Sequence, residues 1–335
     1  MKHLSRIFVV IGVVGLGVVI LLNLKQLSSF THLITHIRLF FVLIVILIQL
    51  ASYYLNALYY RSILRVFGYS IRVLRLFEGA LAANFVNYIA PTAGMAGAAF
   101  LSQVLRPEVP RGKGVLTQIM RYALSALAVL LMMPIGILLV VATRRHSNVA
   151  IDHVAVTSAG LILLLAILVV GLVHQERILR KLVSRLSKWL EKHFKKFKSE
   201  YAERFTIDFY AGYRTMMLSK FKMLRPFCWS IIYILVEMLT VYVAFLALGK
   251  LVNPGIVIMG YLLANIASTL GGTFFSTGVY ELGMLGTFVA FQIPFALALS
   301  VTLVYRVLNL IIGLPPGFIY YRKYLKTSRD LREIV

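Results

Sequence analysis

The sequence predicts an all-α integral membrane protein with about six transmembrane helices and two re-entrant hairpins of broken helix. The chain has 335 residues, of which 60% are hydrophobic and 14% are charged. Its apolar residues are gathered into runs of about 20, the length of helix that crosses a hydrocarbon core about 30 Å thick. Two longer apolar stretches are interrupted at their centres by proline or glycine, which favours hairpins that enter the membrane and return.

This composition excludes several other classes of protein. Soluble domains have about a quarter of their residues charged, and so few charges cannot cover the surface of this much apolar side chain. A disordered chain is excluded because disorder requires low hydrophobicity. Cys228 is the only cysteine, so no internal disulfide can frame a secreted domain.

The first half of the chain contains three expected spans and the first broken stretch. Residues 7–24 follow a basic N-terminus, but no small-x-small cleavage site follows them, so we expect a retained helix and not a signal peptide. The second span is 39–60. Residues 76–105 form an apolar stretch that is broken at 90–94, and the next span is 115–142.

The second half repeats this order of elements. A span over 154–173 is followed by a long polar segment, and the next span is 227–248. Residues 256–292 form the second broken stretch, which is interrupted at 271–278. The last span is 295–320, which passes through two adjacent prolines.

The positions of the basic residues orient these spans. If both broken stretches return to the side they came from, both termini are cytoplasmic, and 28 of the 35 Lys and Arg lie on that side, at the termini and within 61–75, 106–113 and 174–225. Cytoplasmic segments are rich in Lys and Arg. If each stretch crossed once, the strongly basic segment would lie outside. The net charge of +23 is therefore a topology signal, and nucleic acid is not an expected partner.

Two units, about 76–142 and about 256–320, resemble each other at an offset of about 184 residues within a single membrane domain of residues 1–335. Each unit has an apolar half-helix with an Asn, a break with glycine, a second half-helix and a span with a lone Arg. The first hairpin enters from the cytoplasm and the second from outside, so the units are inverted. Inverted repeats with broken helices build midplane substrate sites in many transporters. The breaks therefore predict a cavity.

Four ionisable residues lie within the expected membrane segments, where a charge is costly and usually faces a partner or water. Glu281 and Arg306 fit an ion pair that either locks the second hairpin or contacts a charged substrate. Arg121 has no matching carboxylate, so it fits either an anion ligand or a cation that reaches to the interface. Glu237 fits either a proton-coupling carboxylate or a buried acid hydrogen-bonded to a tyrosine such as Tyr233.

Amide side chains flank both breaks. Asn84, Asn87 and Asn265 lie beside them, and Asn309 lies in the last span. Such amides either join helices or contact a lipid headgroup. The predicted headgroup cavity therefore consists of Arg121, Arg306, Glu281, Asn84, Asn87, Asn265 and Glu237, with hairpin breaks at Pro91, Gly94 and Gly278.

The polar segment 174–225 carries 14 basic and 5 acidic residues. Its apolar residues recur at helical spacing, which predicts a cytoplasmic amphipathic helical segment that lies on an anionic membrane surface. Headgroup gathering and partner binding are alternatives. These apolar residues are Leu182, Leu186, Trp189, Leu190, Phe194, Phe197, Tyr201 and Phe205.

No recognisable catalytic motif is present. The chain has no Gly-rich phosphate loop, no His-Glu-x-x-His, no pair of cysteines and no Gly-x-Ser-x-Gly. We therefore expect a protein that is not an enzyme and that has no cofactor, metal site or catalytic residue.

The residues of the two breaks resemble a known family. The run from Asn84 to Gly94, the run from Ser276 to Glu281, and Arg306 are similar to the flippase-like membrane domain of the lysylphosphatidylglycerol synthases and its stand-alone members. The resemblance covers nearly the whole chain. The second hairpin of the family usually carries the motif Pro-Gly-Gly-x-Gly-x-x-Glu, of which this chain has only Gly278 and Glu281. The acidic residue that the family often has in its first hairpin is absent from this chain. The chain continues about fifteen residues past its last span, so we expect a member without the aminoacyl-transferase domain.

The leading hypothesis is a flippase or lipid transporter in a prokaryotic cell membrane, which moves an anionic phospholipid or a phosphate-linked lipid carrier between leaflets. Its expected partners are membrane lipids, and a second copy of the chain or an envelope-biosynthesis enzyme is a further candidate. The alternative is a non-transporting scaffold subunit for an enzyme that modifies envelope lipids or glycans. A transporter of small solutes or ions is a third hypothesis.

Overall fold

A computed structural model describes five stretches of the chain, residues 33–89, 95–142, 175–193, 220–270 and 276–333, together with a few single positions. The predicted span 7–24, most of the predicted span 154–173, and the predicted breaks at Pro91 and Gly94 lie outside these residues.

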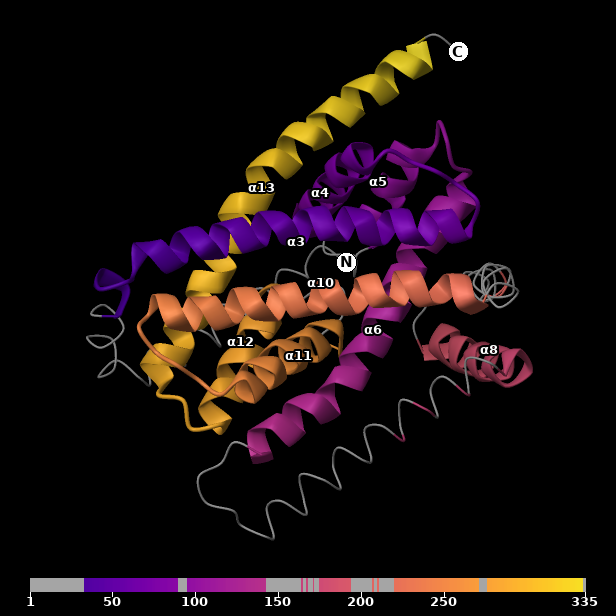
Figure 1. Ribbon diagram of the computed structural model, residues 1–335. Helices are drawn as coiled ribbons and strands as arrows, with labels where there is room; N and C mark the ends of the chain where they lie inside the picture. The colour runs from indigo at the N-terminus through magenta and orange to yellow at the C-terminus, as the bar shows by residue number, and fades with distance from the viewer. Residues whose placement is uncertain are drawn as a thin grey trace.

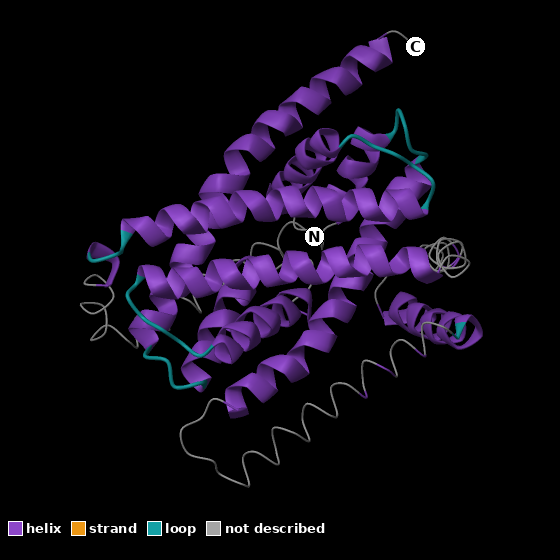
Figure 2. Cartoon of the chain, viewed as in Figure 1, coloured by secondary structure: helices purple, strands orange, loops and turns teal. Residues whose placement is uncertain are grey.

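All of the secondary-structure elements in these stretches are helices (Figures 1 and 2). This confirms the all-α fold class. The helices are α3 (Leu39–Val66), α4 (Val73–Ile89), α5 (Met95–Leu105), α6 (Arg111–Ala142), α8 (Glu176–His193), α10 (Lys220–Ala247), α11 (Pro254–Leu270), α12 (Ser276–Ala290) and α13 (Phe295–Glu333).

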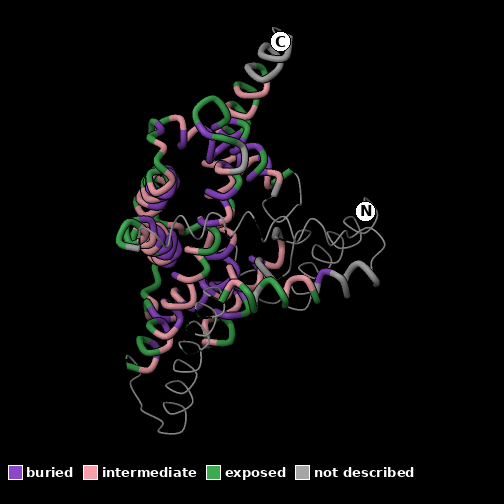
Figure 3. The backbone as a smooth tube through the Cα atoms, turned by 90° about the vertical axis from the view of Figure 1, so that its right-hand side faces the viewer, coloured by how far each residue is buried: buried purple, intermediate pink, exposed green. Residues whose placement is uncertain are grey.

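Four described helices, α3, α6, α10 and α13, are long and apolar enough to cross a membrane. They correspond to four of the six predicted spans. Large apolar side chains such as Leu43, Leu47 and Ile311 lie exposed on their outer faces, where lipid covers them. Figure 3 shows that the long helices carry both buried and exposed residues, as expected for helices between a protein core and lipid. The prolines within α13 do not end the helix.

Each broken stretch forms a pair of short helices. Helices α4 and α5 pack against each other, and so do α11 and α12. They have 17, 11, 17 and 15 residues, at or below the low end of what a perpendicular crossing requires. Helix α12 begins next to Gly278, which has φ +99°, a backbone conformation that glycine adopts without strain. The two pairs correspond to the two broken stretches that the sequence predicts, and the residues between the helices of each pair, 90–94 and 271–275, lie outside the described residues.

The two halves of the described bundle, α3–α6 and α10–α13, pack on each other reciprocally. Helix α3 lies along α10, and Figure 1 shows the two helices running in opposite directions. Helix α4 packs on α13, the last helix of the other half, and α11 packs on α6 in the same way. This exchange favours the predicted inverted repeat.

The predicted amphipathic segment contains a helix over its first part, α8. The ion pair between Glu176 and Arg180, 2.7 Å apart, lies along one face of this helix. Ile178 is exposed. The later apolar positions of the segment, from Phe194 to Phe205, lie outside the described residues.

The reciprocal contacts depend on glycine, which leads to a first prediction. A Cβ at Gly317 of α13 would lie 2.8 Å from the carbonyl oxygen of Leu81 in α4, and a Cβ at Gly255 of α11 would lie 2.7 Å from the carbonyl oxygen of Gly136 in α6. Gly317→Ala and Gly255→Ala should each lower the free energy of unfolding by about 1–3 kcal/mol, because the helices must move apart.

Unfolding by a denaturing detergent, followed by tryptophan fluorescence, measures this loss. Gly286→Ala is the matched control, since a Cβ at Gly286 of α12 meets no atom within 4 Å. Equal stability of all three variants would show that these helices are not held by close backbone approach.

Candidate functional site

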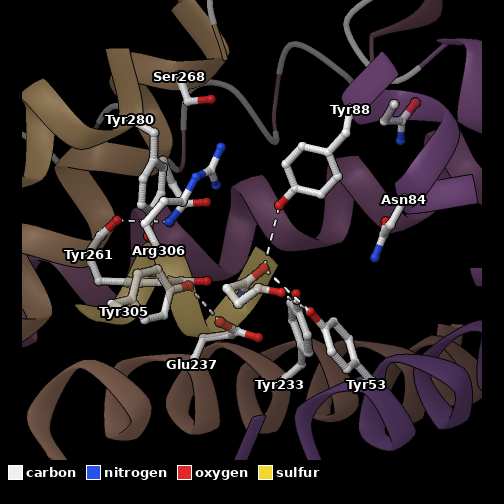
Figure 4. Close-up of a pocket in the computed structure, with 13 residues that line it drawn as sticks. Tyr53, Asn84, Tyr88, Tyr233, Glu237, Tyr261, Ser268, Tyr280, Tyr305 and Arg306 are labelled. Carbon is white, nitrogen blue, oxygen red and sulfur yellow. Dashed lines mark hydrogen bonds between the residues drawn. The ribbon is translucent and has the colours of Figure 1, made fainter. Parts of the chain in front are cut away.

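A cavity of about 260 Å³ lies between the two halves, and each of its lining residues carries a polar side chain (Figure 4). Six are tyrosines, four are asparagines, and the others are one serine, one glutamate and one arginine. Helices α3 and α4 contribute from the first half, and α10, α11, α12 and α13 from the second. The lining residues are Tyr53, Asn84, Asn87, Tyr88, Tyr233, Glu237, Tyr261, Asn265, Ser268, Tyr280, Tyr305, Arg306 and Asn309.

An ion pair joins the last helix to the second hairpin. The Nε atom of Arg306 lies 2.6 Å from Oε1 of Glu281. The Nε–H does not point at this oxygen, so the contact is ionic and is not an aligned hydrogen bond. The guanidinium carbon lies 5.4 Å from the ring centroid of Tyr88 and 5.7 Å from that of Tyr280, which places the cation on two aromatic faces.

The second carboxylate oxygen of Glu281 is used at the start of α12. The backbone N–H of Gly278 donates to Oε2 at 2.6 Å. A helix's first N–H groups have no partner within the helix, and a side-chain carboxylate three residues on satisfies one of them. Glu281 thus connects the beginning of the second half-helix to Arg306 in α13.

Glu237 of α10 is held as a buried acceptor of three hydrogen bonds. Tyr305 donates to Oε2 at 2.7 Å, and Gln49 and Ser52 of α3 both donate to Oε1, Gln49 at 3.3 Å. The partner is therefore Tyr305 and not Tyr233, because Tyr305 projects from α13 across the cavity. No Lys, Arg or His among the described residues lies within salt-bridge distance of Glu237.

Arg121 of α6 does not line the cavity but lies in a cage of tyrosines beside it. Its Nε–H donates to Oδ1 of Asn56 at 2.9 Å. Its guanidinium carbon lies 5.2 to 5.9 Å from four ring centroids, those of Tyr59, Tyr60, Tyr122 and Tyr233. Within the described residues no carboxylate pairs with it. Tyr233 is part of both the tyrosine cage around Arg121 and the wall of the cavity.

The amides of the cavity wall differ in their partners. Asn309 accepts hydrogen bonds from the hydroxyls of Tyr53 and Tyr88. Asn87 accepts from the backbone N–H of Gly97 at 2.8 Å, and Nδ2 of Asn265 donates to the carbonyl of Tyr261.

Two lining groups lack an aligned hydrogen bond among the described residues. The side-chain amide of Asn84 on α4 makes none, and the hydroxyl of Tyr280 on α12 lies beside that of Tyr305 without an aligned hydrogen bond. Figure 4 shows these two residues on opposite sides of the cavity.

The structure thus brings most of the predicted site residues together. Arg306, Glu237, Asn84, Asn87 and Asn265 line the cavity, and Glu281 lies directly against Arg306. Arg121 lies behind Tyr233, and Gly278 lies at the start of α12.

Of the six tyrosines that line the cavity, the sequence pointed only to Tyr233, as a hydrogen-bond partner of Glu237 and not as a lining residue. The chain has 18 tyrosines, and three that line the cavity, Tyr88, Tyr280 and Tyr305, directly adjoin predicted site residues. That adjacency is the available signal, because neighbours on a helix point in different directions and either one can face the cavity.

Comparison with known proteins gives one family and one named relative. Residues 7–317 match the sequence model of the lysylphosphatidylglycerol synthase TM region. The chain is 24% identical over 287 residues to the UPF0104 membrane protein MJ1595 of Methanocaldococcus jannaschii. The aligned region covers 83% of this chain and 83% of that protein. No solved structure matches the chain.

The buried carboxylate leads to a second prediction. Tyr305→Phe removes the hydrogen bond to Oε2 of Glu237 and should lower the free energy of unfolding by about 1–3 kcal/mol, because a buried acceptor loses one of its three donors. The control is Tyr54→Phe on α3, whose side chain is exposed on the outer surface. Detergent titration compares the two variants, and an equal effect would contradict a special role for the Glu237 contact.

Proposed function

We propose that this chain, which belongs to the family of the lysylphosphatidylglycerol synthase TM region, is a lipid transporter that moves a phosphate-bearing lipid between the two leaflets of the membrane. The family match and the long apolar helices show a multi-pass membrane protein. The substrate class and the transport activity are what we propose in addition.

The proposal rests above all on a cavity inside an apolar helical bundle whose lining residues all carry a polar side-chain group. A lipid headgroup that crosses the hydrocarbon core loses its hydration, and a wall of hydroxyl, amide and charged groups replaces it. The cavity is built at the meeting of both hairpins with the long helices, the arrangement that transporters with broken helices use for substrate sites.

The position of Tyr88 favours a lipid over a small solute. Tyr88 lines the cavity and is 37% exposed. The adjacent Ile89 is 57% exposed, and Val307 and Ile311 are exposed apolar residues of α13, the helix that packs on α4. A headgroup in the cavity therefore has an outlet toward lipid, through which acyl chains can remain in the bilayer.

Arg306 is the proposed ligand of the phosphate group. A guanidinium presents a planar fork of donors that matches a phosphate, and it remains charged in a buried place. Glu281 holds Arg306 by an ionic contact without an aligned hydrogen bond, so a phosphate can compete for the same cation. The ion pair would then be the resting state of the site and the phosphate complex its loaded state.

Replacing Arg306 tests this function. Arg306→Ala should slow the transport of chain-labelled phosphatidylglycerol in reconstituted vesicles by at least about tenfold, because hydrogen bonds between charged groups contribute about 1.5–3 kcal/mol and 1.4 kcal/mol is a factor of ten. Arg306→Lys keeps the charge without the fork and should give an intermediate rate. Accessibility of the labelled lipid to a membrane-impermeant quencher measures the rate.

Arg322→Ala is the matched control, since Arg322 lies on the same helix, stacks on Phe318 and is remote from the cavity lining. It should transport lipid at the rate of the unmodified protein. Unchanged transport by folded Arg306→Ala would remove this residue from the mechanism. Absence of transport by the folded, unmodified protein, together with copurification of an envelope enzyme, would favour a scaffold subunit instead.

A further inference from the structure

We propose that the cavity selects a lipid whose phosphate carries an uncharged polyhydroxyl ring, such as an inositol or a sugar. This inference rests on the proposed lipid transport and adds the chemical class of the headgroup. It concerns the part of the headgroup that lies beyond the phosphate.

The wall of the cavity is dominated by neutral groups that both donate and accept hydrogen bonds. Eleven of its thirteen residues are tyrosine, asparagine or serine. A phenol, an amide or a hydroxyl offers at least one donor and one acceptor. A ring hydroxyl also does both, whereas a phosphate or carboxylate only accepts and an ammonium only donates. The wall therefore matches hydroxyl groups better than it matches additional charges.

The charged groups of the site are already engaged with the protein. Arg306 contacts Glu281, and Glu237 accepts three hydrogen bonds from protein groups. A headgroup amine at Glu237 would have to displace those donors, and a headgroup carboxylate would meet two glutamates and one arginine. Both would lose hydration without a matching partner, which is costly in a buried site. A neutral ring avoids this cost.

Two lining residues without an aligned hydrogen bond lie on opposite sides of the cavity and suit a ring between them. Within the described residues, the amide of Asn84 makes no hydrogen bond, and the hydroxyl of Tyr280 has none that is aligned, although it lies beside that of Tyr305. Figure 4 shows the two residues on opposite sides. Buried polar groups are rarely left unpaired in native proteins unless a ligand or water completes them. Hydroxyls on the two edges of one ring would satisfy both.

The size of the cavity fits a single ring. Its volume of about 260 Å³ lies just below the roughly 300–1,000 Å³ of pockets for drug-sized ligands, so it has room for one ring.

The test compares phosphatidylinositol with phosphatidylserine, both labelled on an acyl chain, in vesicles that contain the purified full-length protein. The two lipids carry the same phosphodiester and the same net charge, but one headgroup is a neutral polyhydroxyl ring and the other a charged amino acid. We expect phosphatidylinositol to cross at least about tenfold faster, because a site built for hydroxyl groups rejects a headgroup that lacks them.

Two variants on opposite walls connect this preference to the cavity. Tyr280→Phe and Asn84→Ala should each slow phosphatidylinositol by about two- to tenfold, the effect of losing one hydrogen bond, and should slow phosphatidylserine by a smaller factor, so that the preference for phosphatidylinositol falls. Tyr54→Phe, on the outer surface of α3, is the matched control and should change neither rate. If one variant does not fold, the other still gives the comparison.

The outcomes separate this inference from the proposed function. If phosphatidylserine crosses as fast as phosphatidylinositol, the headgroup inference is wrong and lipid transport stands. If the folded protein moves phosphatidylglycerol but neither of these two lipids, the headgroup inference is wrong and lipid transport stands. If it moves none of the three, both are wrong. Free myo-inositol at millimolar concentration should not inhibit the transport of phosphatidylinositol. If it does inhibit, and also binds the protein in the absence of lipid, the ligand is a soluble polyol and the inference of a lipid headgroup is wrong.

Discussion

A polar group inside a membrane must find its partner within the protein, and this constraint organises the centre of the bundle. Hydrocarbon offers no hydrogen bonds, so each buried hydroxyl, amide or carboxylate needs a protein group, water or substrate. Glu237 meets this requirement with donors from α3 and α13, and Asn309 accepts hydrogen bonds from Tyr53 and Tyr88. The same contacts that satisfy the polar groups therefore also hold the two halves together.

The two arginines occupy corresponding positions in the two predicted repeats but have different surroundings. Arg306 contacts Glu281, whereas the position that matches Glu281 in the first unit is Gly97. A Cβ at Gly97 would lie 2.4 Å from the side chain of Asn87, so an acidic side chain has no room there. Arg121 is instead stabilised by tyrosine faces and Asn56. Of these two arginines, only Arg306 is paired with a carboxylate among the described residues.

The hairpins give the cavity its position. Their helices are short, and polar residues of these helices, such as Asn84 and Tyr280, line the cavity between the two halves. Close approach of backbones at Gly255 and Gly317 brings each hairpin against the last helix of the other half. A headgroup held there would contact elements of both halves, so movement of one half relative to the other would change its access to each leaflet.

The sequence by itself determined the fold class, the described spans and the two broken stretches, because hydrophobic length and the positions of proline and glycine are local properties of a membrane chain. It also identified Arg306, Glu281, Glu237 and the asparagines, since polar residues in apolar runs are conspicuous. Only the tertiary structure decided that Arg121 lies outside the cavity lining, that Glu237 pairs with Tyr305, and that tyrosines dominate the wall. The helical period fixes which residues share a face, but the packing of helices distant in sequence decides which faces meet.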